Sequence, residues 1–280
     1  MIPLTPNAAS HRHLVDPMKR YASLLGLFFV FALRAADSAP RPTLFIIGDS
    51  TVKNGTRGQR GWGEVISPFF DTNKIRIENH AIGGRSSRTF LTEGRWDKVL
   101  TNLQPGDFVL IQFGHNDGGA VNDTSRARGS IKGAGEQTQE IDNLLTKKRE
   151  VVHTFGWYLR KYVADAKAKG ATPIVCSLVP RKIWKDAQIT RGDNYAKWAE
   201  EVARAEDAAF VDLREIIARR YDALGTDQVN ELFGDDHTHT NPAGAELNAE
   251  CVVAGLKAWP AMPLNKLFSP RAETVAAFAR

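Results

Sequence analysis

The chain has 280 residues, of which 42% are hydrophobic and 25% are charged, and its formal net charge is +5. This composition is that of an ordinary globular protein with room for one large domain. The mild positive charge permits an acidic substrate, but it is far from the dense basic runs of nucleic-acid-binding proteins, so no nucleic-acid partner is expected.

The N-terminal segment, residues 1–38, has the layout of an export signal. A basic pair at 19–20 precedes an apolar run at 24–33, and small residues follow at 35, 36, 38 and 39. This order is typical of a secretory signal peptide, and the run is too short to span a bilayer comfortably. We expect Met18 to be the true start and the mature protein to be secreted or periplasmic, without stable membrane insertion. A retained membrane anchor is the alternative.

Short apolar runs alternate with helical patterns from Thr43 onward. Strands are predicted over 43–47, 75–79, 108–113, 172–177 and 209–211. Helices are predicted around 63–70, 96–103, 149–169, 193–206, 214–224 and 242–258. Such alternation indicates a parallel sheet covered on both faces. The sequence therefore predicts a three-layer, flavodoxin-like α/β/α sandwich with a five-stranded parallel sheet.

This sandwich is expected to occupy residues 39–262 as one domain. The last predicted helix has Asn241 as its N-cap and Pro242 at its first position, where proline is favoured. Residues 263–280 are predicted to form a C-terminal tail. For 269–280 a loose conformation is expected, with a short amphipathic helix as the alternative.

Polar segments follow four of the predicted strands. Residues 48–50 follow the first strand, 80–88 the second, 114–117 the third and 179–182 the fourth. Ligands bind beyond the carboxyl ends of the strands in such sheets, so we expect these segments to meet at one rim. Residues 118–138 are rich in Gly, Ser, Asn and charge, and they are predicted to form a long polar loop on the same rim.

Ser50 is a candidate nucleophile because a serine just beyond a buried strand presents its hydroxyl at the rim, although such a serine is also common in turns and helix caps. It would need a base and an orienting carboxylate. Asp236 and His239 lie three residues apart before the last helix and can supply both from one loop. A divalent-metal site is one alternative for this pair, but no further His or Cys cluster completes it. Helix capping is the other, and Asn241 already accounts for it.

Three groups are candidates to hold an oxyanion. They are the N–H of Ser50, a backbone N–H in the glycine-rich turn at 82–85, and the side-chain amide of Asn116. Glycine at position 84 permits close approach of the backbone to a substrate, and an amide is a neutral donor. A plain turn is the alternative interpretation for both Gly84 and Asn116.

Together these signals resemble the SGNH/GDSL hydrolase superfamily and, more narrowly, its rhamnogalacturonan acetylesterase branch. The resemblance is carried by Gly48–Thr51, Gly61–Glu64, Gly84–Arg88, Glu93–Arg95, Phe113–Gly119 and Asp236–His239. It implies a serine esterase of the predicted sandwich fold that needs no metal or cofactor. In it Ser50 is the nucleophile, His239 the base and Asp236 its orienting carboxylate, while Ser50, Gly84 and Asn116 form the oxyanion hole.

The resemblance also implies an acetylated plant cell-wall polysaccharide as substrate, most specifically rhamnogalacturonan. From the residues themselves, Arg85, Arg88 and Arg181 are candidates to pair with galacturonate carboxylates. Trp62 and Trp184 are candidates to stack on sugar rings. The alternative is that these arginines are solvated or structural and that both tryptophans belong to the core.

Other functions stay open at this point. They include an esterase acting on xylan or on carbohydrates in general, a thioesterase, a lysophospholipase, and a non-catalytic carbohydrate-binding protein on a decayed hydrolase scaffold. The intact site residues argue against decay. The two cysteines, Cys176 and Cys251, show neither metal-ligand spacing nor a disulfide framework. We interpret them as buried free thiols, with pairing as the alternative.

Overall fold

A computed structural model describes residues 41–192 and 194–279; the predicted export signal lies outside the described residues. The main sheet has five parallel strands in the order β2-β1-β3-β6-β9. The strands are β1 (Thr43–Gly48), β2 (Arg76–Asn79), β3 (Phe108–Gln112), β6 (Thr172–Cys176) and β9 (Ala209–Val211). The predicted five-stranded parallel sheet is confirmed.

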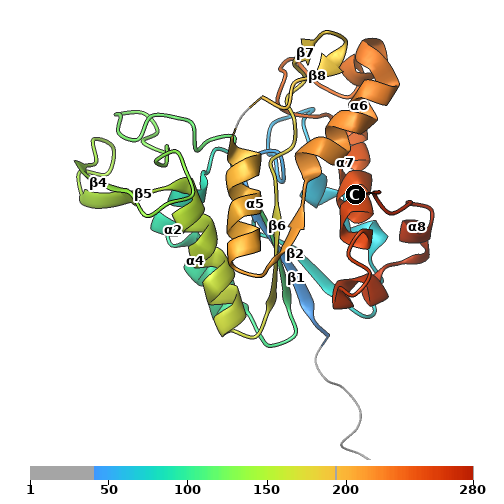
Figure 1. Ribbon diagram of the computed structural model, residues 1–280, viewed down its shortest axis with the longest axis horizontal. Coiled ribbons are helices and arrows are strands. Elements are labelled where there is room, and N and C mark those ends of the chain that lie inside the picture. The colour runs from blue at the N-terminus through green and yellow to red at the C-terminus, as the bar shows by residue number, and fades with distance from the viewer. Residues whose placement is uncertain (1–40, 193, 280) are drawn as a thin grey trace, which may run out of the picture. The chain divides into compact units, whose positions relative to one another are not determined.

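Helices cover both faces of this sheet (Figure 1). One face packs against α2 (Ser87–Thr92), α3 (Arg95–Asn102), α4 (Phe155–Ala168) and α5 (Tyr195–Ala205). The other packs against α6 (Leu213–Asn230) and α7 (Pro242–Lys257). Because successive side chains of a strand point to opposite faces, Phe45 and Ile47 enter the first core, and Leu44 and Ile46 enter the second.

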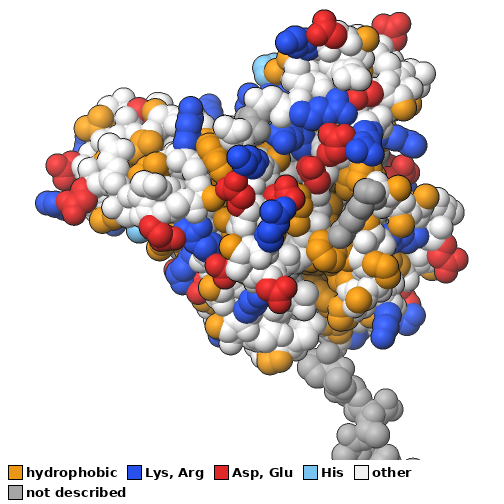
Figure 2. Space-filling view, viewed as in Figure 1, with side chains coloured by type: hydrophobic (Ala, Val, Ile, Leu, Met, Phe, Trp, Pro, Cys, Tyr) orange, Lys and Arg blue, Asp and Glu red, His pale blue; other side chains and the backbone are white. Residues whose placement is uncertain are grey.

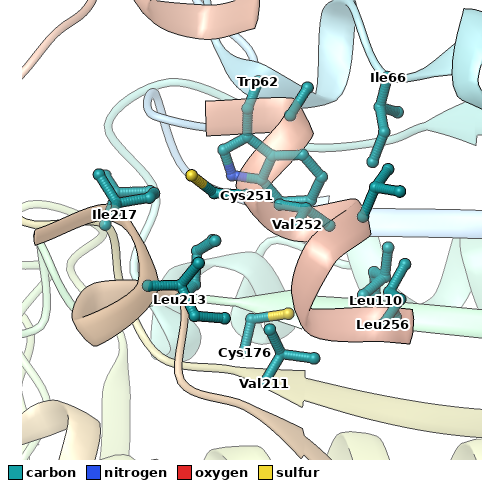
Figure 3. Close-up of a cluster of buried hydrophobic side chains, with 14 of the residues drawn as sticks. Trp62, Ile66, Leu110, Cys176, Val211, Leu213, Ile217, Cys251, Val252 and Leu256 are labelled. Atoms are coloured by element: carbon teal, nitrogen blue, oxygen red, sulfur yellow. The ribbon is translucent and has the colours of Figure 1, made fainter. Parts of the chain in front are cut away.

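Both cysteines lie in the core between the sheet and the α6–α7 layer (Figure 3). Cys176 is on β6 and Cys251 is on α7, and both are buried free thiols, as predicted. Burial raises the pKa of each thiol to about 12. These thiols therefore pack as small apolar side chains and do not act as nucleophiles.

The helix predicted over 149–169 is wrong in its first part. The polar loop leads into a hairpin of two strands, β4 (Thr138–Asp142) and β5 (Arg149–His153), which projects from the body beside α4 (Figure 1). The adjacent β-branched residues Val151 and Val152 favour the strand. Helix α4 begins only after Thr154, whose side chain accepts a hydrogen bond from the Trp157 N–H.

Three smaller differences concern turns. The predicted helix at 63–70 consists of two 3₁₀ turns, η2 (Trp62–Glu64) and η3 (Ser67–Phe69). Helix α6 extends beyond the prediction to Asn230, through a kink at Gly225, whose φ is 79°. A short hairpin, β7 (Trp184–Lys185) and β8 (Gln188–Ile189), was not predicted, because two-residue strands carry too little pattern.

The C-terminal segment is packed, contrary to the expectation of a loose tail. It forms η4 (Pro263–Leu267) and a short helix, α8 (Pro270–Glu273). Leu264 and Ala272 are fully buried, and the N–H of Phe278 donates to the carbonyl of Ala254 at 2.9 Å. The apolar side chains of this segment therefore close the edge of the core beside α7 and η3.

Basic and acidic side chains are interspersed over the face seen in Figure 2. Across the described residues, none of the helices combines the length and the apolar character needed to span a bilayer.

Candidate active site

Ser50 lies in a tight turn at the carboxyl end of β1. The N–H groups of Val52 and Lys53 both donate to the carbonyl of Asp49 at 3.1 Å. Only glycine fits at position 48, because a Cβ there would lie 2.6 Å from the carbonyl oxygen of Gln112. The buried end of the strand thus turns sharply and presents Ser50, which is half-buried, at the rim of the sheet.

A buried polar network supports this turn from below. The carboxylate of Asp49 accepts hydrogen bonds from the N–H and the hydroxyl of Thr51 at 2.9 and 2.8 Å. Gln112 donates to the same hydroxyl at 2.8 Å and accepts from the indole N–H of Trp62 at 2.8 Å. Three side chains, those of Asp49, Thr51 and Gln112, are thus linked by hydrogen bonds beneath Ser50, which favours one conformation of the turn, while the second carboxylate oxygen of Asp49 is buried without a partner among the described residues.

Asp236 and His239 occupy the loop that leads into α7. Helix α7 is capped by Asn241, which accepts from the Gly244 N–H at 3.0 Å, so the capping role predicted for Asn241 is confirmed. Asp236 Oδ1 accepts from the His239 N–H at 2.7 Å, and Oδ2 lies 2.7 Å from His239 Nδ1. The carboxylate therefore fixes both the backbone and the ring of His239.

The loop and the Ser50 turn meet although they lie 189 residues apart in the chain. Ser50 Oγ is 2.8 Å from His239 Nε2. With its Nδ1 proton directed to Asp236, a neutral imidazole has Nε2 free to accept the Ser50 proton. The three side chains thus have the geometry of a serine nucleophile with its base and orienting carboxylate.

The carboxylate of Asp236 is ionised over the whole physiological pH range. Burial opposes its ionisation, but hydrogen bonds from the His239 ring and from the N–H groups of His239 and Thr238 outweigh burial and lower the pKa of Asp236 to about 2. A persistent negative charge beside Nδ1 stabilises the imidazolium that forms when His239 takes a proton.

The three predicted oxyanion donors lie around one cleft of about 700 Å³, which Ser50 and His239 also line. Gly84 has a φ of 78°, a left-handed conformation that favours glycine. Neither the Ser50 N–H nor the Gly84 N–H donates to a protein acceptor within the described residues. Asn116 donates one amide proton to the carbonyl of Arg85 at 2.8 Å, which leaves its second proton for a ligand.

The family model described as the GDSL-like lipase/acylhydrolase family matches residues 46–247. This chain belongs to that family. It is therefore a carboxylic ester hydrolase, and the resemblance to the SGNH/GDSL superfamily is confirmed. Ser50, Gly84, Asn116, Asp236 and His239 all lie within the matched range.

Relatives of this GDSL-family chain include a rhamnogalacturonan acetylesterase of Emericella nidulans. It is 35% identical over 221 residues, which cover 78% of this chain and 86% of the relative. A probable rhamnogalacturonan acetylesterase of Bacillus subtilis, YesY, is 28% identical over 76% of this chain and 92% of its own length.

Among solved structures, the YxiM protein of Bacillus subtilis matches with a TM-score of 0.64 and 24% identity, over 79% of this chain and 58% of that one. The chain thus spans less than two thirds of that structure. The acetylxylan esterase Axe2 of Geobacillus stearothermophilus matches with a TM-score of 0.52 and 19% identity, over 77% and 94% of the two chains. Both likenesses support the sandwich fold.

The structure of the GDSL-family chain removes two residues from the predicted substrate surface. Arg88 is buried within α2, where its guanidinium pairs with Glu150, so it cannot meet a polysaccharide. Trp62 is fully buried in the core, and its indole N–H is used by Gln112. Trp184 is half-buried in β7 and packs against the core outside the residues that line the cleft.

Four arginines do line the cleft: Arg85 and Arg181, which were predicted, and Arg126 and Arg128, which were not. The last two come from the polar loop that was expected on this rim. Their positive charge within that loop was the sequence signal that could have identified them as cleft residues. Arg85 also donates to the carboxylate of Glu93 at 3.0 Å. Among the described residues, no cluster of three His, Cys, Asp or Glu side chains forms a metal-binding group.

Two fully buried carboxylates lie beneath this rim. Burial raises the pKa of Asp49 and of Asp117 to about 6, because desolvation outweighs the hydrogen bonds that each accepts. For Asp117 these hydrogen bonds come from Ser87 and Ser130, which lie on the neighbouring rim segments. Asp117 therefore ties together two segments that frame the cleft, at an electrostatic cost that depends on pH.

The substitution Asp117→Asn is expected to remove a pH dependence from stability. Below about pH 4 the carboxyl is protonated in both states; between pH 4 and 6 the unfolded chain releases the proton and the folded chain keeps it. The free energy of unfolding of the wild type, relative to that of the variant, should thus fall by about 2–3 kcal/mol from pH 4 to pH 7. Urea unfolding across this range measures it. A constant difference between the two proteins would contradict the raised pKa.

Proposed function

We propose that the protein is a carbohydrate acetylesterase that removes O-acetyl groups from rhamnogalacturonan by a Ser-His-Asp acyl-enzyme mechanism. The observation that carries the mechanism is the distance of 2.8 Å between Ser50 Oγ and His239 Nε2 in an open cleft. Export of the mature enzyme, on the pattern of residues 1–38, is part of the same proposal.

In the first half of the reaction, His239 Nε2 takes the hydroxyl proton while Ser50 Oγ forms a bond to the acetyl carbonyl carbon. The tetrahedral intermediate then collapses, and the sugar oxygen leaves with the proton from His239. In the second half, His239 takes a proton from water while the water oxygen attacks the carbonyl carbon of acetyl-Ser50; the bond from this carbon to Ser50 Oγ then breaks, Oγ takes the proton back from His239, and acetate leaves. Each half begins with an imidazole whose Nε2 carries no proton.

The negative charge of the tetrahedral oxygen is assigned to the N–H groups of Ser50 and Gly84 and to the amide of Asn116. Asn116 is nearly buried, and its bond to the carbonyl of Arg85 fixes the plane of its amide. A donor held in place before the reaction loses no free energy to reorganisation when the charge develops.

Asn116→Ala is expected to lower kcat for a chromogenic acetate ester by about 10²- to 10³-fold, the effect of losing one oxyanion donor. KM should change far less, because the donor acts on the transition state. The matched control is Asn122→Ala, which removes an exposed amide from the neighbouring loop and should leave kcat nearly unchanged. If both variants kept the wild-type kcat, Asn116 would have no role as a donor.

The substrate assignment rests on two supports. The relatives of Emericella nidulans and Bacillus subtilis are named as rhamnogalacturonan acetylesterases, and they align with most of this chain. The cleft beside Ser50 is lined by four arginines, which suit a polymer that contains galacturonate. Acetate release from acetylated rhamnogalacturonan, acetylxylan and longer-chain esters is the test. Preference for acetylxylan or for long acyl chains would contradict the assignment.

A further inference from the structure

Arg128 is held more firmly than its place in a polar surface loop suggests. On one side of it, the Asp123 carboxylate accepts the N–H groups of Ser125, Arg126 and Ala127 at 2.6–3.0 Å. On the other side, the Gly129 N–H donates to the carbonyl of Ala120 at 2.8 Å. The backbone that carries Arg128 is thus fixed at both ends by hydrogen bonds.

The side chain of Arg128 crosses from this loop to the glycine-rich turn beside Ser50. Its stem passes over Gly119, where an added Cβ would lie 3.5 Å from Arg128 Cγ. Its Nη1 donates to the carbonyl of Gly84 at 3.2 Å. Because Asn116 holds the next carbonyl, that of Arg85, the two successive peptides of the turn are fixed from both sides.

The positive charge of Arg128 lies in a partly buried environment near two carboxylates. The guanidinium is half-buried and interacts with the two buried carboxylates, Asp49 and Asp117. Burial, followed by repulsion from Arg126, lowers the pKa of Arg128, but an arginine stays charged at every pH at which the protein is folded. A charged fork that is partly removed from water binds an anion more strongly than an exposed one.

Most of this fork remains available to a ligand. A guanidinium has five N–H donors, and within residues 41–192 and 194–279 the carbonyl of Gly84 is the only hydrogen-bond acceptor of Arg128. The side chain lines the same cleft as Ser50 and His239. An anion bound there would lie beside the reacting ester.

We propose that Arg128 is an anion subsite of the active-site cleft and a positioning residue for the oxyanion turn. It binds the carboxylate of a uronic acid residue of the polymer and, with the same guanidinium, holds the carbonyl of Gly84, which lies in the peptide that follows the Gly84 N–H. The subsite couples substrate charge to the geometry of the donors, because a carboxylate that fixes the fork also fixes Gly84. This inference rests on the proposed esterase function and adds the group that the enzyme recognises.

The anion-binding role and the positioning role of Arg128 can be distinguished by steady-state kinetics on two substrates. Acetate release is measured on an acetylated oligosaccharide that contains free galacturonate, and on the same oligosaccharide after methyl esterification of its carboxyl groups. For Arg128→Gln we expect kcat/KM to fall by about 100-fold on the acidic oligosaccharide, with a higher KM, and by about tenfold on the neutral one, through kcat. The preference for the acidic oligosaccharide therefore falls by about tenfold. Equal losses on both substrates would overturn the subsite.

Arg128→Lys keeps the charge but loses the planar fork, and we expect it to recover part of the KM effect and little of the kcat effect. It also serves where Arg128→Gln folds poorly. Arg204→Gln is the control for loss of one positive charge, because Arg204 lies at the far end of α5, is 77% exposed and is outside the cleft. It should match the wild type on both substrates. If Arg204→Gln reduced the preference for the acidic oligosaccharide as much as Arg128→Gln, the net charge of the protein would determine that preference, and the subsite would be refuted.

Binding without turnover keeps this inference distinct from the esterase proposal. Calorimetric titration with a deacetylated galacturonate oligosaccharide should give a Kd about tenfold weaker for Arg128→Gln than for the wild type. Unchanged affinity would overturn the subsite even in an active enzyme. Conversely, the wild type could hydrolyse no acetate ester while Arg128→Gln still weakened binding of the oligosaccharide. That result would refute the esterase proposal and leave the subsite standing.

Discussion

Ser50→Ala is expected to lower kcat for acetate release by roughly 10⁴- to 10⁶-fold. The hydroxyl of Ser50 lies 2.8 Å from His239 Nε2, and the variant removes the atom that would carry the acetyl group. His239 would be left beside a methyl group with no proton to take. The residual rate would come from the oxyanion donors and from substrate binding, which the substitution leaves intact.

The measurement is hydrolysis of a chromogenic acetate ester together with acetate release from the polysaccharide. Ser269→Ala is the control, because it removes a serine hydroxyl that only donates to the carbonyl of Pro68 in the C-terminal segment. The control should keep the wild-type kcat. Equal activity of Ser50→Ala and the wild type would refute the acyl-enzyme mechanism. KM should change little, since the hydroxyl contributes mainly to the transition state.

Arg88→Ala is expected to reduce the free energy of unfolding by about 3–5 kcal/mol. Its side chain is 1% exposed and forms a two-pronged ion pair with Glu150, with both N–O distances at 2.7 Å. Its remaining arm donates to the carbonyls of Val121 and Gly129. The variant would leave the half-buried carboxylate of Glu150 with the amide of Asn143 as its remaining partner, and it would remove the donor from two carbonyls.

Arg149→Ala provides the matched comparison on the same projecting hairpin. Arg149 pairs with Glu140, but the two side chains are 74% and 60% exposed, so this pair should contribute less than about 1 kcal/mol. Urea unfolding of both variants measures the contrast. A loss below about 1 kcal/mol for Arg88→Ala would mean that the hairpin and the polar loop do not depend on the buried pair. Because Gly129 adjoins Arg128, the same variant should also raise KM for an acidic substrate.

The core of the fold followed directly from local pattern. Four strands of the main sheet, β1, β3, β6 and β9, contain a short apolar run, whereas β2 has Ile77 as its one apolar residue. The α7 boundary follows from Asn241 and Pro242. The hairpin at 138–153 was missed because its strands face solvent on most positions and carry no apolar run. The packing of residues 263–279 was missed because its few apolar side chains are separated by polar ones.

Arg85 and Arg88 show the limit of this reasoning for the site. They stand three residues apart in one motif, yet Arg85 lines the cleft and Arg88 is buried against Glu150. Their residue type is the same, and their environments are set by segments far along the chain. The same reason explains why Arg126 and Arg128 were not predicted as site residues. Whether they line the cleft depends on where the polar loop folds back.

The parallel sandwich, the pairing of Asp236 with His239 and the candidacy of Ser50 could be predicted from the amino-acid sequence, because strand runs, caps and three-residue spacings are local properties. Three features depend on how the chain packs: the contact of Ser50 with His239 across 189 residues, the burial of Trp62 and Arg88 in the interior, and the bond from Arg128 to Gly84. Burial and long-range contact depend on how distant segments pack, and no local pattern in a single sequence carries that information.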